Sequence, residues 1–342
     1  MSTATKGQLK PNSANGAATV KEVISQKSQF TFLMIGIVAI IGTIRFIMEY
    51  GSIINWMQTN FQEPSYGWPS FKDFYITLIF GVFSVIANSI INMFTYKMFY
   101  NVCKEKNNED IRVSKTIKSC NSLYKSIYFI LVTIWGYQTL KDEPYLPKEL
   151  FGKGHLQFIN DNYPVQVWPV GLRCYYLGTM GYHVHQLFAH ALHPIRNDFI
   201  EMFLHHVVTL TLYGGSYLIN ETAAGSVIMF LHDWADIFTS LVRCFTETTL
   251  VTCSVVSAIG MTVSWFYTRI YVFPMTIYYS CFDRDIYHGA KFYGDKYFGS
   301  LLIILYILHV YWFFVLLKSI HRFTKLGKTD DLQQRVEAKK TQ

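Results

Sequence analysis

Charged residues are scarce in this chain of 342 residues, where Asp, Glu, Lys and Arg make up 15% and hydrophobic residues 51%. A water-soluble domain usually carries about a quarter charged residues. The apolar residues gather in long runs, and roughly 20 of them in a row suffice for a helix to cross a bilayer. Aromatic residues reach 17%, and many lie near the ends of these runs, as at membrane interfaces. The composition argues against an ordinary soluble domain and predicts an all-α polytopic membrane protein.

Cysteine is also sparse, with six residues that form no CxxC pair and no metal-binding spacing. Most lie in or beside apolar runs, so we interpret them as small packing residues. The pattern implies no disulfide framework and no metal site. The net charge of +7 comes from Lys and Arg in loops and tails, which is typical of membrane topology signals, so we predict no nucleic-acid partner.

Eight apolar segments are present, and we predict about eight transmembrane helices. The first, second, seventh and eighth are clear, the third is short, and the fourth to sixth are diluted by His, Asp and Arg. Polar residues are costly inside a membrane, so that dilution indicates where function lies. The segments are 30–48, 74–96, 123–140, 168–191, 199–219, 222–244, 250–275 and 297–317.

The distribution of Lys and Arg predicts that both termini are cytosolic. With a cytosolic N-terminus, the cytosolic segments hold 20 of the 30 basic residues and the luminal loops hold 7. The chain ends with Lys339 and Lys340 followed by two residues, which matches a dilysine signal for retrieval to the endoplasmic reticulum. We therefore predict a multi-pass protein of the endoplasmic reticulum membrane, with a disordered cytosolic tail over residues 1–29 and a cytosolic tail over 319–342.

Ionisable residues recur in the fifth and sixth segments. His205 and His206 lie seven and eight residues into a helix that Asp198 is suited to begin, or about 10 Å below the cytosolic surface. On the next helix Asp233 and Asp236 are three apart and share a face. Because a tight turn joins the two helices, we expect them to pack side by side and to bring these groups, with His232, into one polar cavity.

Other charges and histidines within the spans have simpler interpretations. We expect Arg45 to pair with Glu49, and Arg173 and Arg269 to lie near luminal helix ends. For the histidines of the fourth segment we expect mainly structural roles, although one or two could reach the cavity; they are His183, His185 and His190.

Residues 196–243 resemble the signature of ceramide synthases within the TLC-domain superfamily. The matching elements are Arg196-x-Asp198-Phe199-x-x-Met202-x-x-His205-His206-x-x-Thr209 and His232-Asp233-x-x-Asp236. The resemblance implies a TLC domain over 115–318, preceded over 30–114 by two transmembrane helices and a basic cytosolic loop. Its six helices would form a bundle or barrel around a lipid cavity, and the luminal loop at 281–296 would help select acyl length.

The resemblance further implies acyl-CoA-dependent N-acylation of a sphingoid base, giving ceramide and CoA with no bound cofactor. The amine must lose a proton to attack a thioester, and histidine suits that task or can itself accept the acyl group. The catalytic prediction comprises His205, His206, Asp233 and Asp236. The substrate-binding prediction comprises Arg196, Asp198, Thr209 and His232.

Two other functions stay open at this point. A di-iron hydroxylase or desaturase would need clustered histidine motifs, of which the fourth segment carries only near misses. A non-catalytic lipid-binding or translocon-associated relative could lack the double histidine that is present here. The sequence also leaves open the preferred acyl length and sphingoid base, the division of roles between His205 and His206, and whether the protein forms a homo- or heterodimer.

Overall fold

Every regular element of the described residues is helical. The computed structural model describes residues 13–192, 199–282 and 293–326. Each of the eight predicted segments overlaps one of its long helices or helical runs, so the all-α prediction is confirmed. In chain order the elements are α1 (Ser13–Asn60), η1 (Phe71–Phe74), α2 (Tyr75–Val102), α3 (Glu109–Leu140), η2 (Lys148–Leu150), η3 (Leu156–Asn160), α4 (Leu172–Leu192), α5 (Phe199–Leu218), α6 (Thr222–Phe245), α7 (Val251–Trp265), η4 (Phe266–Val272), α8 (Phe273–Ile277), η5 (Tyr278–Phe282) and α9 (Tyr293–Leu326).

Among the residues that the structure describes, four helical stretches are long and apolar enough to cross a membrane. They are Gly36–Asn60, Phe71–Val102, Val251–Phe282 and Lys296–Arg322. These are the four segments that the sequence marked as clear, and they show a multi-pass membrane protein. The helices between them carry more polar side chains, because several of those side chains face the interior of the bundle rather than lipid.

The first helix begins earlier than the sequence predicted. Residues 13–29 belong to α1, so the disordered tail predicted over residues 1–29 is replaced by helix from Ser13 onward, and residues 1–12 lie outside the described part. A helix that is already nucleated by an apolar span extends at little cost. This segment also contains good helix formers such as Ala17, Ala18 and Lys21.

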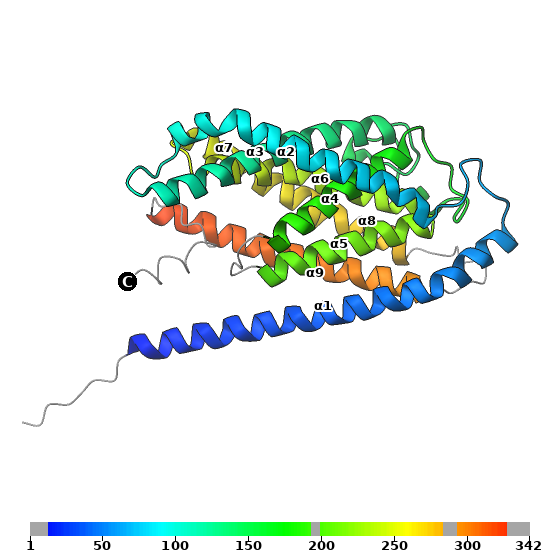
Figure 1. Cartoon of the computed structure of the whole chain (residues 1–342). Coiled ribbons are helices and arrows are strands. Elements are labelled where there is room, and N and C mark those ends of the chain that lie inside the picture. The colour runs from blue at the N-terminus through cyan, green and yellow to red at the C-terminus, as the bar shows by residue number, and fades with distance from the viewer. Residues whose placement is uncertain (1–12, 193–198, 283–292, 327–342) are drawn as a thin grey trace, which may run out of the picture.

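The long helices run roughly along one direction, and the start of α1 and the end of α9 lie at the same end of the bundle (Figure 1). In this arrangement α6 is central, because it packs against α3, α5, α7 and α8. On the other side of the site, α5 contacts α4, α1 and α9. Residues Thr222–Asp233 of α6 are all buried, as expected for a helix that is surrounded on every side.

The turn between α5 and α6 makes these two helices antiparallel neighbours. Asn220 occupies the left-handed region there, with φ of 61°. Its buried side chain accepts a hydrogen bond from Trp168 Nε1 at 3.1 Å and donates one to the Tyr66 hydroxyl at 2.8 Å. Asn tolerates this conformation better than most residues, and its side-chain bonds hold the turn that sets the relative depth of α5 and α6.

The helical run from α7 to η5 contains two π-helical segments, Phe266–Val272 and Tyr278–Phe282. The first directly precedes α8, which has Pro274 in its first turn. Proline lacks the N–H that an α-helical bond needs, and a wider turn accommodates the carbonyl that loses its partner. Segments of this kind are frequent at functional sites, and this one carries Arg269.

Candidate functional site

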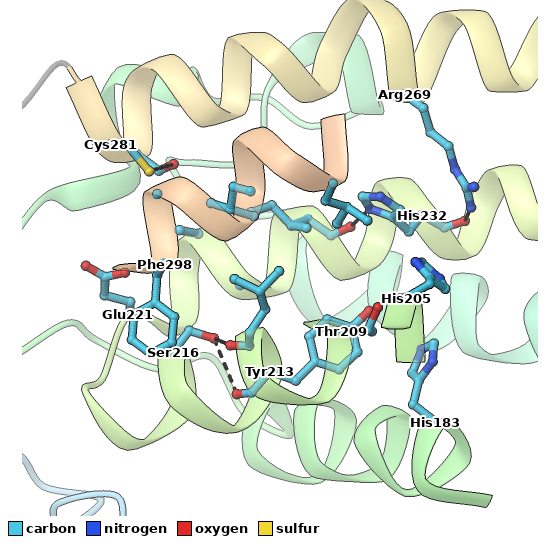
Figure 2. A pocket seen from close by; sticks show the side chains of 18 of the residues that line it. His183, His205, Thr209, Tyr213, Ser216, Glu221, His232, Arg269, Cys281 and Phe298 are labelled. Atoms are coloured by element: carbon cyan, nitrogen blue, oxygen red, sulfur yellow. Dashed lines mark hydrogen bonds between the residues drawn. The ribbon is translucent and has the colours of Figure 1, made fainter. Parts of the chain in front are cut away.

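A cavity of about 60 Å³ lies among α5, α6, α9 and the run from α7 to η5. His205, His183 and Arg269 gather at one end (Figure 2). Glu221 and Cys281 lie at the other end. Much of the wall between the two ends is apolar and includes Leu212, Ala224, Ile228, Phe298, Leu302 and Leu305.

One face of α5 forms a wall of the cavity along its length. His205, Thr209, Tyr213 and Ser216 follow each other at intervals of three or four residues and all line the cavity. At 1.5 Å per residue, the eleven steps from His205 to Ser216 cover about 16 Å. The Thr209 hydroxyl is buried and has no hydrogen-bond partner within the described residues, so it is available to a bound molecule.

The opposite wall comes from α6, where the predicted group of His232, Asp233 and Asp236 does line the same cavity. Asp233 is 1% exposed, and its Oδ2 atom has no hydrogen-bond partner among the described residues. A buried carboxylate oxygen without a partner is costly. Such a group is expected where a substrate or a neighbouring side chain completes the site during the reaction.

Arg269 holds the second carboxylate. Its guanidinium Nη2 donates a hydrogen bond to Asp236 Oδ1 at 2.7 Å, and its side chain is 4% exposed. The simple role expected for Arg269 at a luminal helix end therefore does not hold, because its side chain takes part in the site. Side chains of a helix point toward its N-terminus, and this long one reaches back over the Trp265 ring, 4.1 Å from the ring centre, to the level of Asp236.

The two adjacent histidines of α5 have different surroundings. His205 lines the cavity, whereas His206 is not among the lining residues. The His206 ring instead lies 5.7 Å from the ring of His190 on α4. The Nδ1 atoms of both histidines are buried without a hydrogen-bond partner in the described part of the chain. Of the two predicted catalytic histidines, only His205 therefore faces the space that a substrate would occupy.

Of the three histidines of α4, one faces the cavity and two make structural hydrogen bonds elsewhere. His183 lines the cavity, so it is the one of the three that reaches the site. His185 is buried and its Nδ1 hydrogen-bonds the Ser84 hydroxyl at 2.7 Å. His190 donates from Nε2 to the Phe199 carbonyl at 3.0 Å and ties α4 to the start of α5. The structural interpretation holds for His185 and His190.

Sequence reasoning missed His309 on α9. Its Nε2 atom lies 2.8 Å from Nε2 of His232, and the side chain is fully buried. The rule that flagged the histidines of α5 and α6 applies equally here, since an ionisable residue stands within an otherwise apolar span. The eighth segment was predicted only as a clearly hydrophobic transmembrane helix of the bundle, and His309 was not singled out within it.

Four predicted residues lie outside the described part of the chain, namely Arg196, Asp198, Lys339 and Lys340. The same holds for most of the loop at 281–296. Among the described residues, no group of three or more His, Cys, Asp or Glu side chains is arranged to hold a metal ion.

Comparison with known proteins places the sequence in a family. The family model described as the TLC domain matches residues 118–318, which is more than half of the chain. The chain belongs to the TLC-domain family. The matched region includes every described cavity residue, and it leaves α1 and α2 outside the family domain.

Curated relatives carry names from one enzyme group. Ceramide synthase 4 of Bos taurus is 30% identical over 237 residues, covering 68% of this chain and 58% of the bovine protein. ASC1-like protein 3 of Oryza sativa subsp. japonica is 26% identical over 274 residues, covering 75% and 93%. Ceramide synthase hyl-2 of Caenorhabditis elegans is 23% identical over 303 residues, covering 82% and 89%. The chain thus spans less than two thirds of the bovine relative.

Proposed function

We propose that this TLC-domain protein is an acyltransferase that moves a fatty acyl group from acyl-CoA to the amine of a sphingoid base, giving a ceramide and CoA. One observation carries the proposal: His205, with a buried Nδ1 that has no partner among the described residues, lines a cavity that Asp233 and Asp236 also line. The similarity to ceramide synthases supports the same reaction class.

The length of the cavity suits a fatty acyl chain. An extended hydrocarbon chain advances about 1.25 Å per carbon, as follows from C–C bonds of about 1.5 Å. The roughly 16 Å between His205 and Ser216 therefore takes about 13 carbons. The lining continues beyond Ser216 to Glu221 and Cys281, so the path along the cavity wall is longer than this. A thioester carbonyl at His205 would place its hydrocarbon tail along the apolar walls.

In the mechanism that we propose, His205 accepts the acyl group. The unprotonated ring nitrogen of His205 attacks the thioester carbon, the C–S bond breaks, and the CoA thiolate leaves and takes up the proton that the other ring nitrogen gives up. The amine then attacks the acyl-imidazole carbon, the amide C–N bond forms, the bond from that carbon to the ring nitrogen breaks, and the released ring regains a proton to become neutral histidine. The amine also has to give up a proton, and Asp233 has an oxygen without a partner that can take it.

The other charged groups support this step. Asp236 is neutralised by Arg269, so the site does not hold two unpaired carboxylates. Thr209, one turn from His205 on the same face, has a free hydroxyl that can orient a substrate carbonyl. His206 contributes from behind His205, through packing against His190, rather than by contact with substrate.

We place this reaction in the endoplasmic reticulum membrane, with eight spans, both termini cytosolic and the His205 end of the cavity on the cytosolic side. Acyl-CoA is cytosolic and anionic, so the thioester must be reached from that side, whereas the acyl tail needs an apolar interior. Two features support the orientation. Lys and Arg are in excess in the segments assigned to the cytosol, and the start of α1 lies at the same end of the bundle as the end of α9.

The experiment is a defined reaction with purified protein. Protein in lipid nanodiscs is incubated with palmitoyl-CoA and sphinganine, and N-acylated product is measured by mass spectrometry. We expect product with the natural chain and loss of at least about 10²-fold for His205→Ala, the usual cost of removing an acid–base or nucleophilic group. The matched control is His185→Ala, which removes a buried histidine outside the cavity. Absence of N-acylated product from well-folded natural protein across a series of acyl-CoAs and bases would refute the proposal.

A further inference from the structure

We infer that His309 is a positioning residue for the proposed acyl transfer, because its contact with His232 fixes the turn of α6 that carries Asp233 and Asp236. The inference rests on the proposed function and adds a residue of α9 to it. It comes from the Nε2 atoms of two histidines that are 77 residues apart in sequence, on α6 and α9, and lie 2.8 Å from each other.

The hydrogen bonds of this pair fix which nitrogen carries each proton. Nδ1 of His232 lies 2.7 Å from the carbonyl oxygen of Ile228, and a carbonyl only accepts, so this Nδ1 carries a proton and donates it. In neutral His232 the Nε2 atom is then an acceptor. His309 must donate its own Nε2 proton to it. Nδ1 of His309 is left as an acceptor, and it has no partner within the described residues.

This arrangement uses both nitrogens of His232 inside the protein. His232 lines the cavity, but it offers a substrate only its ring carbons and its face. The sequence-based prediction that His232 binds substrate stays a prediction, and in this geometry such a contact would use the ring carbons or the ring face. Its ring instead links α6 to α9, and the backbone beside it carries the reactive carboxylates.

Asp233 depends on such links, because its own Oδ2 has no hydrogen-bond partner to hold it. Two contacts flank it on α6. On one side His232 is held by His309, and on the other side Asp236 is held by Arg269, whose Nη2 also lies 3.4 Å from the His232 carbonyl. Loss of the first contact frees one side of this turn. A shift of about 1 Å in a reacting group can cost about 10²-fold in rate.

The packing around His309 holds its ring in place for this task. The rings of Trp265, Phe273 and Trp312 lie with their centres 5.7–5.9 Å from that of His309. Trp265 Nε1 also donates to the His309 carbonyl at 3.2 Å. The ring centre of His205 lies 6.5 Å from that of His309, so the pair neighbours the histidine that we propose as acyl acceptor.

The test separates the donor function of His309 from its ability to titrate. In His309→Gln the side-chain amide can supply an N–H at about the position of Nε2, but it has no titratable nitrogen. His309→Leu removes the donor and keeps an apolar volume. The matched control, His185→Leu, removes a buried histidine with a bond of 2.7 Å to Ser84, outside the cavity. For each purified variant, kcat and KM for palmitoyl-CoA and sphinganine are measured, together with the melting temperature.

We expect His309→Gln to keep kcat within about 3-fold of the natural value. His309→Leu should lower kcat by about 10- to 100-fold with little change in KM, because it misplaces a reacting group without removing a contact to substrate. The control should lose melting temperature but not kcat. An active leucine variant would overturn the inference, and so would a glutamine variant as impaired as the leucine variant. If the leucine variant does not fold, His309→Asn, whose donor is too short to reach, takes its place with the same expected loss.

A readout independent of activity separates this inference from the proposed function. In protein labelled with ¹⁵N-histidine, solid-state NMR distinguishes protonated from unprotonated ring nitrogens. We expect the unprotonated Nε2 signal of His232 to move toward that of a free imidazole in His309→Leu but not in His309→Gln. An unchanged His232 signal in the leucine variant would refute the contact itself, whether or not the protein makes ceramide.

Discussion

A longer side chain at Gly299 should shorten the fatty acyl chain that the cavity accepts. Gly299 lines the cavity from α9 near its far end, together with Cys281. A Cβ atom built at Gly299 would lie 3.5 Å from Cys281 Sγ, an ordinary van der Waals distance, so the backbone tolerates a side chain there. We expect the further atoms of that side chain to occupy the end of the cavity that Gly299 and Cys281 line, where the acyl tail would otherwise lie.

The magnitude follows from the length of the side chain. A leucine extends about 4–5 Å from the backbone, and an acyl chain advances about 1.25 Å per carbon, so Gly299→Leu should remove room for about three or four carbons. Acyl chains that end before this level should be accepted as before. Product from the longest chains should fall by one to two orders of magnitude, because a buried overlap of this size costs about 1–3 kcal/mol.

The assay is a competition among acyl-CoAs from 12 to 24 carbons with one sphingoid base, read as the distribution of product chain lengths. Gly51→Leu serves as the control, because a Cβ at Gly51 on α1 meets no atom within 4 Å. We expect a shift toward shorter products for Gly299→Leu and none for Gly51→Leu. An unchanged distribution in an active Gly299→Leu protein would refute the assignment of this end of the cavity as the limit on chain length.

Three further predictions follow from contacts and sequence signals. Arg269→Gln and Asp236→Asn should each lower activity by at least about 10²-fold. The double variant should be little worse than the poorer single variant, because the effects of groups that act as a unit do not add; reaction rates of the purified variants check this. Gly181→Ala should lower the melting temperature strongly, because its Cβ would lie 2.5 Å from a backbone carbonyl of α2, and thermal unfolding in detergent measures it. Replacing Lys339 and Lys340 by Ser should let part of the protein leave the endoplasmic reticulum with unchanged activity per molecule, and fractionation with an enzyme assay would show it.

The positions of the helices followed from sequence because hydrophobic length is a local property. The gathering of His205 and Asp236 at one cavity was also accessible, since helical spacing and a tight turn between two helices fix their relative depth. Which of the two adjacent histidines faces the cavity was not. Neighbouring positions differ by about 100° around a helix, and the rotation of α5 is set by its packing against α1, α4 and α9.

The two residues that were misjudged or missed depend on contacts between distant parts of the chain. Arg269 was assigned a depth from its backbone position, but its side chain reaches back about one turn to Asp236. His309 contacts His232 because α9 packs beside the helical run that follows α6. No local pattern in the sequence predicts that contact. A rule that treats every ionisable residue of an apolar span as a candidate would have included both residues.

The most direct test of the proposed mechanism is the intact mass of the protein after incubation with palmitoyl-CoA in the absence of a sphingoid base. The account predicts a mass increase of one palmitoyl group, which disappears when sphinganine is added. The adduct should be absent in His205→Ala and should form in His206→Ala, because only His205 faces the cavity. An adduct that persists in His205→Ala, or normal ceramide production by that variant, would contradict the assignment of His205 as the acyl acceptor.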